Sequence, residues 1–548
     1  MRRLLISLVS IALITSASAS HSADIPQEQR IILKTNLYEM AQGQLFDDLD
    51  SWSMSPSQIQ MSYDDVLRRN TMNKVLCEKV DDPYCNDVLR LLVRSYLPKC
   101  EDATTQYCVE DFSAFRNGVR IQGRYLKPYP AGALKGQFDA DPKYGLPAGK
   151  SGGLWQLPGL QHSGGSDTYW VNAQLFGQLM RKSATNKFDP YIPYNLWSSI
   201  SAVTEEVAPG ARAIAASDFG GGDGQQRRDL GDGRQCLVTE TDKCLLAWPL
   251  DESISYSMTV RMAIPLSSWM HGRLNNPEVS AAKGADGFFR LVLKGKPIKV
   301  PTLFAEVPWK DANQSMKARF GEKPSGCCGW TAGGWYDVGG RNQSSDQMIS
   351  DLKLWLPLVN DKASANPTYW IVRSATWGEN TDMKCLNVNS VNGIVTTNAT
   401  AYISGAPVFN KETQSLDYRV SSPHFGQDGK VNIGTYNLQI NSKVARCIYG
   451  FSDAPITASI SVIGEGGENR VAVTTVQERD GWIYLSASGF TYSSPTLRVT
   501  FSQKQTNSKV VQKPTPAPKT LSITCVKGST IKKITGVNPM CPKGFKKR

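Results

Sequence analysis

Most of the chain consists of short runs in which apolar and polar residues alternate, a pattern that predicts β-strands. In residues 456–462 every second residue is Ile, Ala or Val and the residues between them are Thr or Ser, which places one row of side chains on a buried face. Other runs expected to form strands are 168–176, 255–264, 288–293, 352–356, 368–374, 470–476, 482–487 and 497–501. Because strands do not alternate regularly with helices, we do not expect a parallel α/β sheet.

The first part of the chain has the spacing of helices instead. Within residues 27–112 apolar residues recur at intervals of three and four, most clearly in 31–40, 63–80 and 86–97, as on one face of a helix. We therefore predict a mainly β protein with an N-terminal α-helical region and β-sandwich-like domains that are stabilised by disulfides.

Residues 1–19 have the features of a secretory signal peptide. Arg2 and Arg3 precede an apolar run at 4–14, and Ala17-Ser18-Ala19 fits a cleavage site. The apolar run is too short to cross a bilayer as a helix. We expect an exported protein without a transmembrane span, extracellular or associated with the cell wall.

The remaining 548 − 19 = 529 residues are enough for about three domains. We predict a disulfide-stapled helical region at 27–112 and a large β-rich domain, or a pair of domains, at 113–374. A β-sandwich is expected at 375–503. A linker rich in Pro, Lys and Thr follows at 504–520, and a basic tail ends the chain at 521–548.

The chain has twelve Cys, and an even number in an exported protein indicates disulfides. No Cys-x-x-Cys pair is present, which argues against zinc, and we expect no cofactor. Pairing by proximity predicts the bonds Cys77–Cys85, Cys100–Cys108, Cys236–Cys244, Cys385–Cys447 and Cys525–Cys541. The neighbours Cys327 and Cys328 either form a strained ring or reach distant partners such as Cys236 or Cys244.

Positive charge is concentrated at the end of the chain. Residues 504–548 contain ten Lys, one Arg and no Asp or Glu. The whole chain carries +12, so subtracting 11 for this segment and 2 for Arg2 and Arg3 leaves a body near −1. The basic residues around the last predicted disulfide are Lys527, Lys532, Lys533, Lys543, Lys546, Lys547 and Arg548.

Each of these cations contributes on the order of 1 kcal/mol near an anionic surface, and less as salt rises. We expect the tail to bind surface polyanions such as wall polymers or lipid head groups; a merely solubilising tail is the alternative. A single aromatic residue, Phe545, and no recognisable nucleic-acid fold argue against nucleic acid as the partner.

Several segments near the end of the chain resemble a known family. Thr524-Cys525-Val526-Lys527-Gly528, Val537-Asn538-Pro539 and Cys541-Pro542-Lys543-Gly544-Phe545-Lys546-Lys547 resemble the tail of many secreted actinobacterial proteins. Residues 443–451, 480–482 and 489–491 resemble a β module that accompanies this tail. The resemblance covers 430–548, about a fifth of the chain. It implies export and a β module followed by a basic tail, and since the family has no assigned function it implies no activity.

Motifs that suggest catalysis have simpler explanations. Gly149-Lys150-Ser151-Gly152-Gly153 lacks the glycine spacing of a phosphate loop, and the strand and helix that a nucleophile elbow requires are not expected around it. We expect a flexible loop. His162 and His271 are expected to be structural, with a catalytic role for His162 as the alternative.

Acidic residues give no clear site either. Glu205 and Glu206 are neighbours that point apart, unlike the facing acids of a glycosidase. Four Asp in a Gly-rich stretch do not have EF-hand spacing, so a solvated loop is expected; they are Asp218, Asp223, Asp229 and Asp232.

The most distinctive segment is 326–336, where Gly residues flank Cys327 and Cys328. Trp330, Trp335 and Tyr336 offer flat faces that can stack on a sugar ring, and we take them as the candidate glycan-stacking residues. Eleven of the thirteen Trp lie between positions 155 and 377, and for most of them we expect a place in a large β core, where their area stabilises most.

These features predict an exported, cell-surface-associated binding or structural protein rather than an enzyme. Its tail contacts anionic wall polymers and its middle domain binds a glycan. The first alternative is a secreted hydrolase of a glycan or wall polymer, with carboxylates or His162 brought together from distant strands. The second is a structural surface-layer or adhesin component.

Overall fold

A computed structural model describes residues 25–30, 41–46, 56–70, 74–217, 230, 232–308, 311–320, 335–337, 345–375, 383–385, 390–403, 405–452, 456–464, 469–471, 473–492, 496–503, 521–536 and 538–548. The chain divides into two compact units. The first, the body, comprises Met1–Asp453 and Thr457–Ser502, and the second comprises Ala454–Ile456 and Gln503–Arg548. No helix in the described part of either unit is long and apolar enough to span a membrane.

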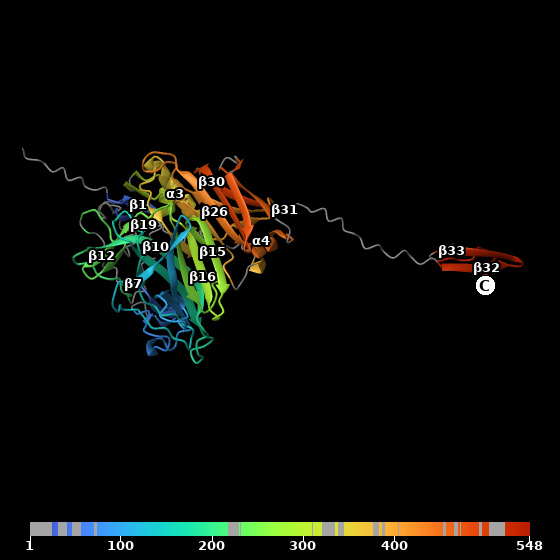
Figure 1. The fold of residues 1–548 in the computed structure, drawn as a ribbon, viewed down its shortest axis with the longest axis horizontal. Coiled ribbons are helices and arrows are strands. Elements are labelled where there is room, and N and C mark those ends of the chain that lie inside the picture. Colours follow the sequence, from blue (N-terminus) through green and yellow to red (C-terminus); the bar gives the residue numbers. More distant parts are fainter. Residues whose placement is uncertain are drawn as a thin grey trace, which may run out of the picture. The chain divides into compact units, whose positions relative to one another are not determined.

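Strands make up most of the body (Figure 1), which confirms the mainly β fold. Its largest sheet has 15 strands among the described residues. The main path is β29 (Val473–Arg479), β30 (Trp482–Thr491), β26 (Ile433–Asn441), β22 (Gly393–Thr397), β14 (Trp269–Arg273), β21 (Ile371–Ser374), β10 (Ile192–Val207), β9 (Thr168–Met180), β4 (Arg90–Tyr96), β2 (Gln58–Met61) and β3 (Leu76–Cys77). Two branches leave it: β12 (Lys243–Trp248) with β11 (Val238–Glu240) on β10, and β8 (Gly152–Gln156) with β7 (Arg124–Tyr129) on β9.

Smaller sheets complete the body. A five-stranded sheet is ordered β15 (Asn275–Lys283), β16 (Phe289–Lys296), β13 (Ser255–Met262), β5 (Cys108–Arg116), β6 (Val119–Gln122). A six-stranded sheet contains β23 (Ala401–Tyr402), β25 (Ser415–Ser421), β31 (Thr496–Gln503), β27 (Ile456–Ile463), β28 (Asn469–Val471) and β24 (Val408–Asn410). A three-stranded sheet is ordered β18 (Leu303–Pro308), β1 (Ala41–Phe46), β19 (Trp335–Asp337). A two-stranded sheet pairs β17 (Ile298–Lys299) with β20 (Thr368–Tyr369).

Helices are short in the described residues. They are α1 (Tyr63–Arg69), α2 (Gln314–Phe320), α3 (Ser345–Trp355) and α4 (Ser442–Tyr449), with 3-10 turns η1 (Gln27–Gln29), η2 (Pro83–Cys85), η4 (Leu356–Val359) and η5 (Met383–Cys385). Asn441 caps α4, since its side chain accepts the N–H groups of Lys443 and Val444, and Gly450 ends the helix with a φ of 64°.

An aromatic core joins the large sheet to the five-stranded sheet. The ring of Phe112 on β5 lies 6.0 Å from Trp155 on β8 and 5.9 Å from Tyr169 on β9, and Tyr169 lies 5.7 Å from Tyr256 on β13. Such rings stabilise a core through their large buried area. The expectation that most Trp fill the core is confirmed for five residues, which are Trp155, Trp170, Trp269, Trp355 and Trp370.

The N-terminal helical prediction is largely wrong. In the described part of the segment 63–80, α1 is the one helix, and Leu76–Cys77 form strand β3. The segment 86–97 contains strand β4. Along β4 buried and half-buried positions alternate, because the strand lies between β2 and β9. A short run with apolar residues on both faces has the same composition as a buried helix, so spacing alone did not distinguish them. The segment 31–40 lies outside the described residues.

The segment 352–356 was predicted as a strand and is helical. It falls at the end of α3 and in η4, where Ile349, Leu352 and Trp355 are buried at intervals of three. That interval fits a helix rather than a strand.

All five predicted disulfides among the described cysteines are present: Cys77–Cys85, Cys100–Cys108, Cys236–Cys244, Cys385–Cys447 and Cys525–Cys541. The Cys385–Cys447 bond ties η5 to α4. Cys327 and Cys328 lie outside the described residues.

Strands from every predicted segment of the body meet in one sheet. The large sheet contains β4 from 27–112, β9 and β10 from 113–374, and β26 and β30 from 375–503. The alternating strands predicted after residue 455 are found, but β29 and β30 belong to the large sheet whereas β27 and β31 belong to the six-stranded sheet.

Candidate functional site

The tail is a small antiparallel sheet of its own. Strand β32 (Leu521–Lys527) lies between β33 (Thr530–Gly536) and β34 (Lys546–Lys547). Gly528 has a φ of 57° and begins the two-residue turn between β32 and β33, a position that favours glycine. The Cys525–Cys541 bond closes the sheet on one side, and Cys525 is fully buried.

The predicted anion-binding residues of the tail are all exposed. They are Lys527, Lys532, Lys533, Lys543, Lys546, Lys547 and Arg548. Cross-strand register places Lys532 and Lys547 on either side of Cys525. No acid neutralises them from within the tail, because residues 504–548 contain neither Asp nor Glu.

The predicted glycan-stacking residues are only partly covered by the structure. Trp330 lies outside the described residues. Trp335 and Tyr336 belong to β19, which pairs in parallel with β1; nothing is described of their side chains. Their role in stacking stays a prediction.

His162 has a structural environment. Its Nε2 lies 3.1 Å from the carbonyl oxygen of Val203, and its Nδ1 accepts the N–H of Gly164 at 3.1 Å. Burial lowers the pKa of His162, and its ring stacks on Trp248 at 6.4 Å. Both ring nitrogens are therefore engaged by backbone groups rather than by a Ser hydroxyl and an acid.

The segment at Gly149 is anchored by hydrogen bonds rather than flexible. Lys150 donates its N–H to the Tyr96 carbonyl at 2.9 Å and accepts from Ser57 at 2.9 Å. Ser151 is buried and accepts from Gln137 at 2.9 Å. Strand β8 follows instead of a helix, so the segment presents neither a phosphate loop nor an exposed nucleophile. The adjoining cavity of about 30 Å³ has room for about one water molecule.

Two of the acidic candidates, Glu205 and Asp232, are paired with bases. Glu205 lies 3.1 Å from the Lys127 ammonium and 3.0 Å from that of Lys243. Burial opposes ionisation of Glu205, but these two lysines outweigh it and lower its pKa. Asp232 pairs with Arg234 at 2.7 Å. Asp218, Asp223 and Asp229 lie outside the described residues, and the part that is described contains no cluster of three metal-binding side chains.

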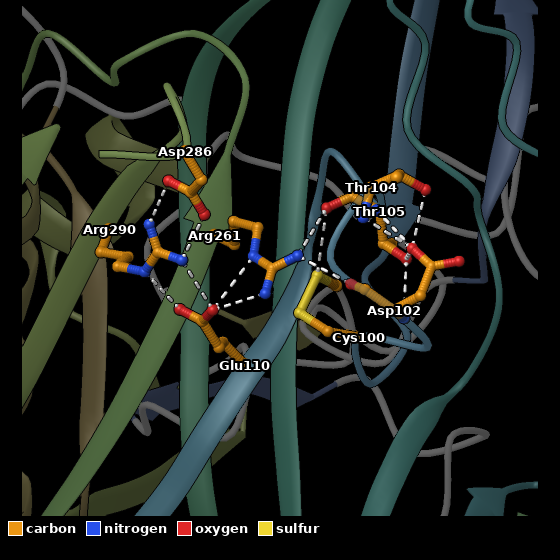
Figure 2. The surroundings of a disulfide bond; sticks show 9 residues. Cys100, Asp102, Thr104, Thr105, Glu110, Arg261, Asp286 and Arg290 are labelled. Carbon is orange, nitrogen blue, oxygen red and sulfur yellow. Dashed lines mark hydrogen bonds and ion pairs between the residues drawn. A yellow bond between two sulfur atoms is a disulfide. The ribbon is translucent and has the colours of Figure 1, made fainter. Parts of the chain in front are cut away.

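A larger charge cluster lies beside the Cys100–Cys108 bond (Figure 2). Glu110 on β5 accepts from Arg261 at 2.5 Å and from Arg290 at 2.8 Å, and Arg290 also pairs with Asp286 at 2.7 Å. Arg261 donates to the carbonyl oxygen of Asp102 at 2.8 Å as well. The Cys100–Cys108 disulfide closes a loop, and the charge cluster connects this loop to β13 and β16. These charges therefore have a structural role.

The described body also has a surface groove of about 280 Å³ between β15 and three strands of the large sheet. Its lining is Asn276, Pro277, Glu278, Asn437, Leu438, Gln439, Gln477, Arg479, Tyr484, Leu485 and Ser486. Register sets Gln439, Tyr484 and Gln477 in one row across β26, β30 and β29. Side chains that pair across strands share a face, so this row forms the floor of the groove.

Polar side chains hold the groove together. Gln439 is fully buried; it accepts the N–H of Val279 at 2.8 Å and donates to the carbonyl oxygen of the same residue at 2.6 Å. These two hydrogen bonds to the edge strand β15 resemble those of a backbone pair in a sheet. Ser486 donates to Asn437 at 2.8 Å, and Asn437 donates to Thr396 at 3.1 Å.

The two charged residues of the groove lining, Glu278 and Arg479, carry opposite charges. The Arg479 guanidinium lies 4.7 Å from the centre of the Tyr484 ring and 3.6 Å from Glu278, which also pairs with Lys294 at 2.9 Å. Burial raises the pKa of Tyr484, although Arg479 opposes this shift. The hydroxyl of Tyr484 therefore stays protonated and can donate. Amides, hydroxyls and one aromatic ring without a dominant charge suit a neutral polyhydroxylated ligand.

Sequence reasoning missed this groove because its lining comes from residues 276–278 and 437–486, which form no local motif. One signal was present. Asn437 and Gln439 alternate with apolar residues in a strand that is buried on both faces, so their polar groups require partners.

No protein-family model matches the chain, and no curated protein matches it either.

Proposed function

We propose that this is an exported binding protein that its tail holds on anionic polymers of the cell surface. The observation that carries the proposal is the separation of charge between a body near −1 and the C-terminal residues 504–548, linker and tail together, which carry +11. All seven cations of the tail itself are exposed. The signal-like segment 1–19 and five disulfides support an oxidising, extracellular location.

Binding to isolated cell walls tests the tail. We compare the full protein with a variant that ends at Ser502, at low and at high salt. The full protein should bind walls at low salt and be released by salt, because attraction between exposed charges is screened, and the shortened variant should bind much more weakly. Equal binding of both at low salt would contradict the proposal.

A second function, glycan binding, is favoured by the groove on β15, β26, β29 and β30. Its neutral set of amide and hydroxyl groups beside the Tyr484 ring supports a sugar as ligand. A volume of about 280 Å³ is near the lower end of small-molecule sites, roughly 300–1,000 Å³, so one or two sugar rings are expected to occupy it.

Calorimetric titration with neutral oligosaccharides of glucose, galactose, mannose and N-acetylglucosamine tests this second function. The variant Q477A/Y484F removes an exposed amide and the Tyr484 hydroxyl, and it should weaken binding by roughly tenfold or more, since each lost hydrogen bond contributes about 0.5–1.5 kcal/mol. Ser280→Ala, exposed on β15 outside the lining, is the control. Absence of binding by the unaltered protein, or equal binding by the double variant, would reject the groove as the site.

A further inference from the structure

The cations of the tail are divided between the two faces of its sheet. Cross-strand pairs share a face, and Cys525 pairs with both Lys532 and Lys547. Lys527, two residues along β32, lies on the same side. We call this side the disulfide face.

The opposite side, which we call the Val526 face, also carries three cations. Val526 pairs with Lys546, and Thr524 pairs with Lys533. Arg548 donates its N–H to the carbonyl oxygen of Thr524 at 2.9 Å, which continues the register of β34. Ser522 and Thr535 confirm the assignment of this face, because their hydroxyls lie 2.9 Å apart across β32 and β33.

The cations have the same layout on the two faces, although on the disulfide face the segment that carries Cys541 and Phe545 packs beside them: Cys525 is fully buried, and the Lys532 ammonium lies 5.3 Å from the centre of the Phe545 ring. On the disulfide face Lys532 and Lys547 flank the central strand and Lys527 occupies a neighbouring row. On the Val526 face Lys533 and Arg548 flank the central strand and Lys546 occupies the neighbouring row. Two strand spacings separate a flanking pair by about 10 Å. The seventh cation, Lys543, lies in the turn before β34.

A flat anionic surface can engage only one such face. A sheet layer is about 10 Å thick, and the screening length at physiological salt is about 8 Å. When one face rests on a membrane, the cations of the other face lie more than a screening length away and contribute little. A flexible chain of anions can pass over both faces at once.

We propose that the ligand of the tail is a flexible linear polyanion that contacts both faces of the sheet, rather than a flat lipid surface. This inference rests on the proposed function of the tail and adds the kind of partner. An anionic wall polymer with phosphodiester or carboxylate groups along its length has the required chemistry. The tail is thereby enclosed within a polymer mesh instead of adsorbed on a plane.

Two matched variants of the full chain test the inference. K527Q/K532Q/K547Q removes three charges from the disulfide face, and K533Q/K546Q/R548Q removes three from the Val526 face. The probes are soluble poly(glycerol phosphate) and vesicles of phosphatidylglycerol and phosphatidylcholine in equal parts. Non-reducing peptide mapping checks that Cys525–Cys541 remains closed in each variant.

Both variants should weaken binding to poly(glycerol phosphate) by similar factors, on the order of 10- to 100-fold for three cations at physiological salt, where the two faces lie more than a screening length apart. Each variant should also lower the slope of the logarithm of the binding constant against the logarithm of salt concentration by about half. The inference is overturned if one variant loses nearly all affinity while the other keeps it, or if the full protein prefers the vesicles to the polymer. Those results would leave polyanion binding by the tail intact, whereas equal binding by the variant ending at Ser502 would instead reject the tail proposal itself.

Discussion

At Glu110 two guanidinium groups share one carboxylate inside the body. The Arg261 side chain is only 8% exposed and that of Glu110 is 23% exposed, so neither charge is fully hydrated. Burial alone would raise the pKa of Glu110, but hydrogen bonds from Arg261 and Arg290 outweigh it and lower the pKa. A buried charge that loses its partner destabilises a fold more than the pair had stabilised it.

Glu110→Gln should therefore lower the free energy of unfolding by about 1–3 kcal/mol near neutral pH, less than the roughly 3–5 kcal/mol of a fully buried pair. A lowered folded-state pKa gives stability that is present above the unfolded value, about 4.3, and is lost as pH falls through the folded value. The difference between the variant and the unaltered protein should thus shrink below about pH 4. Urea unfolding at several pH values measures it, and Asp286→Asn, at the exposed end of the cluster, is the control expected to change less.

The burial of His271 leads us to expect a second pH dependence of folding stability, nearer neutral pH. It is buried against Tyr402, with ring centroids 4.8 Å apart, and burial, then Arg373 and Arg273, lower its pKa well below the usual value. The unfolded chain then binds a proton from about pH 6.5 downward while the folded chain does not, so stability falls by up to about 1.4 kcal/mol per pH unit. His271→Gln should flatten the urea-midpoint profile between about pH 6.5 and 5; an unchanged slope would contradict the assignment.

Among the elements, the prediction from sequence succeeded where the two faces of a strand differ in polarity. Strand β27 has Thr and Ser on its outer face, so its alternation was visible. Strand β4 has Leu91 and Val93 on one face and the half-buried Leu92 on the other, because it lies in the interior of a sheet, and it was mistaken for a helix. Four of the five disulfides join cysteines that are 8 or 16 residues apart, and this proximity made them predictable. The groove depends instead on which strands meet, and that is decided by tertiary contacts.

Replacing Gln439 tests how much this single side chain, which bonds β26 of the large sheet to β15 of the five-stranded sheet, contributes to stability. Replacing it by Met keeps the volume but leaves the N–H and carbonyl of Val279 without their partner, which costs about 1–3 kcal/mol for each unsatisfied buried group. Gln439→Met should lower the unfolding midpoint and open the groove between β15 and β26. Gln477→Ala, an exposed amide in the same groove, should leave stability within about 0.5 kcal/mol. Equal midpoints for the two variants would show that the Gln439 bonds do not hold β15 in place.

For the whole molecule, the basic isoelectric point of about 9.0 describes the two units together and neither of them separately. The strand pairs of the tail sheet are internal to the tail, as β33, β32 and β34 pair only with each other in the described residues. The strands of the large sheet likewise come from the body. Folding of the body is therefore expected to proceed without the tail.

Truncation after Ser502 should remove the net positive charge of the protein without changing its thermal stability. If residues 1–19 are removed on export, the shortened protein carries about −1, from 12 − 11 − 2, and should pass through a cation exchanger near neutral pH that retains the full protein. Its thermal midpoint, followed by circular dichroism, should match that of the full protein, because the tail supplies no strand to the described sheets of the body. Retention of the shortened protein would place a cationic surface on the body, and a midpoint lowered by several degrees would show that the tail stabilises it. The expected pair of results, lost retention with unchanged melting, is what a separately folded anchoring unit requires.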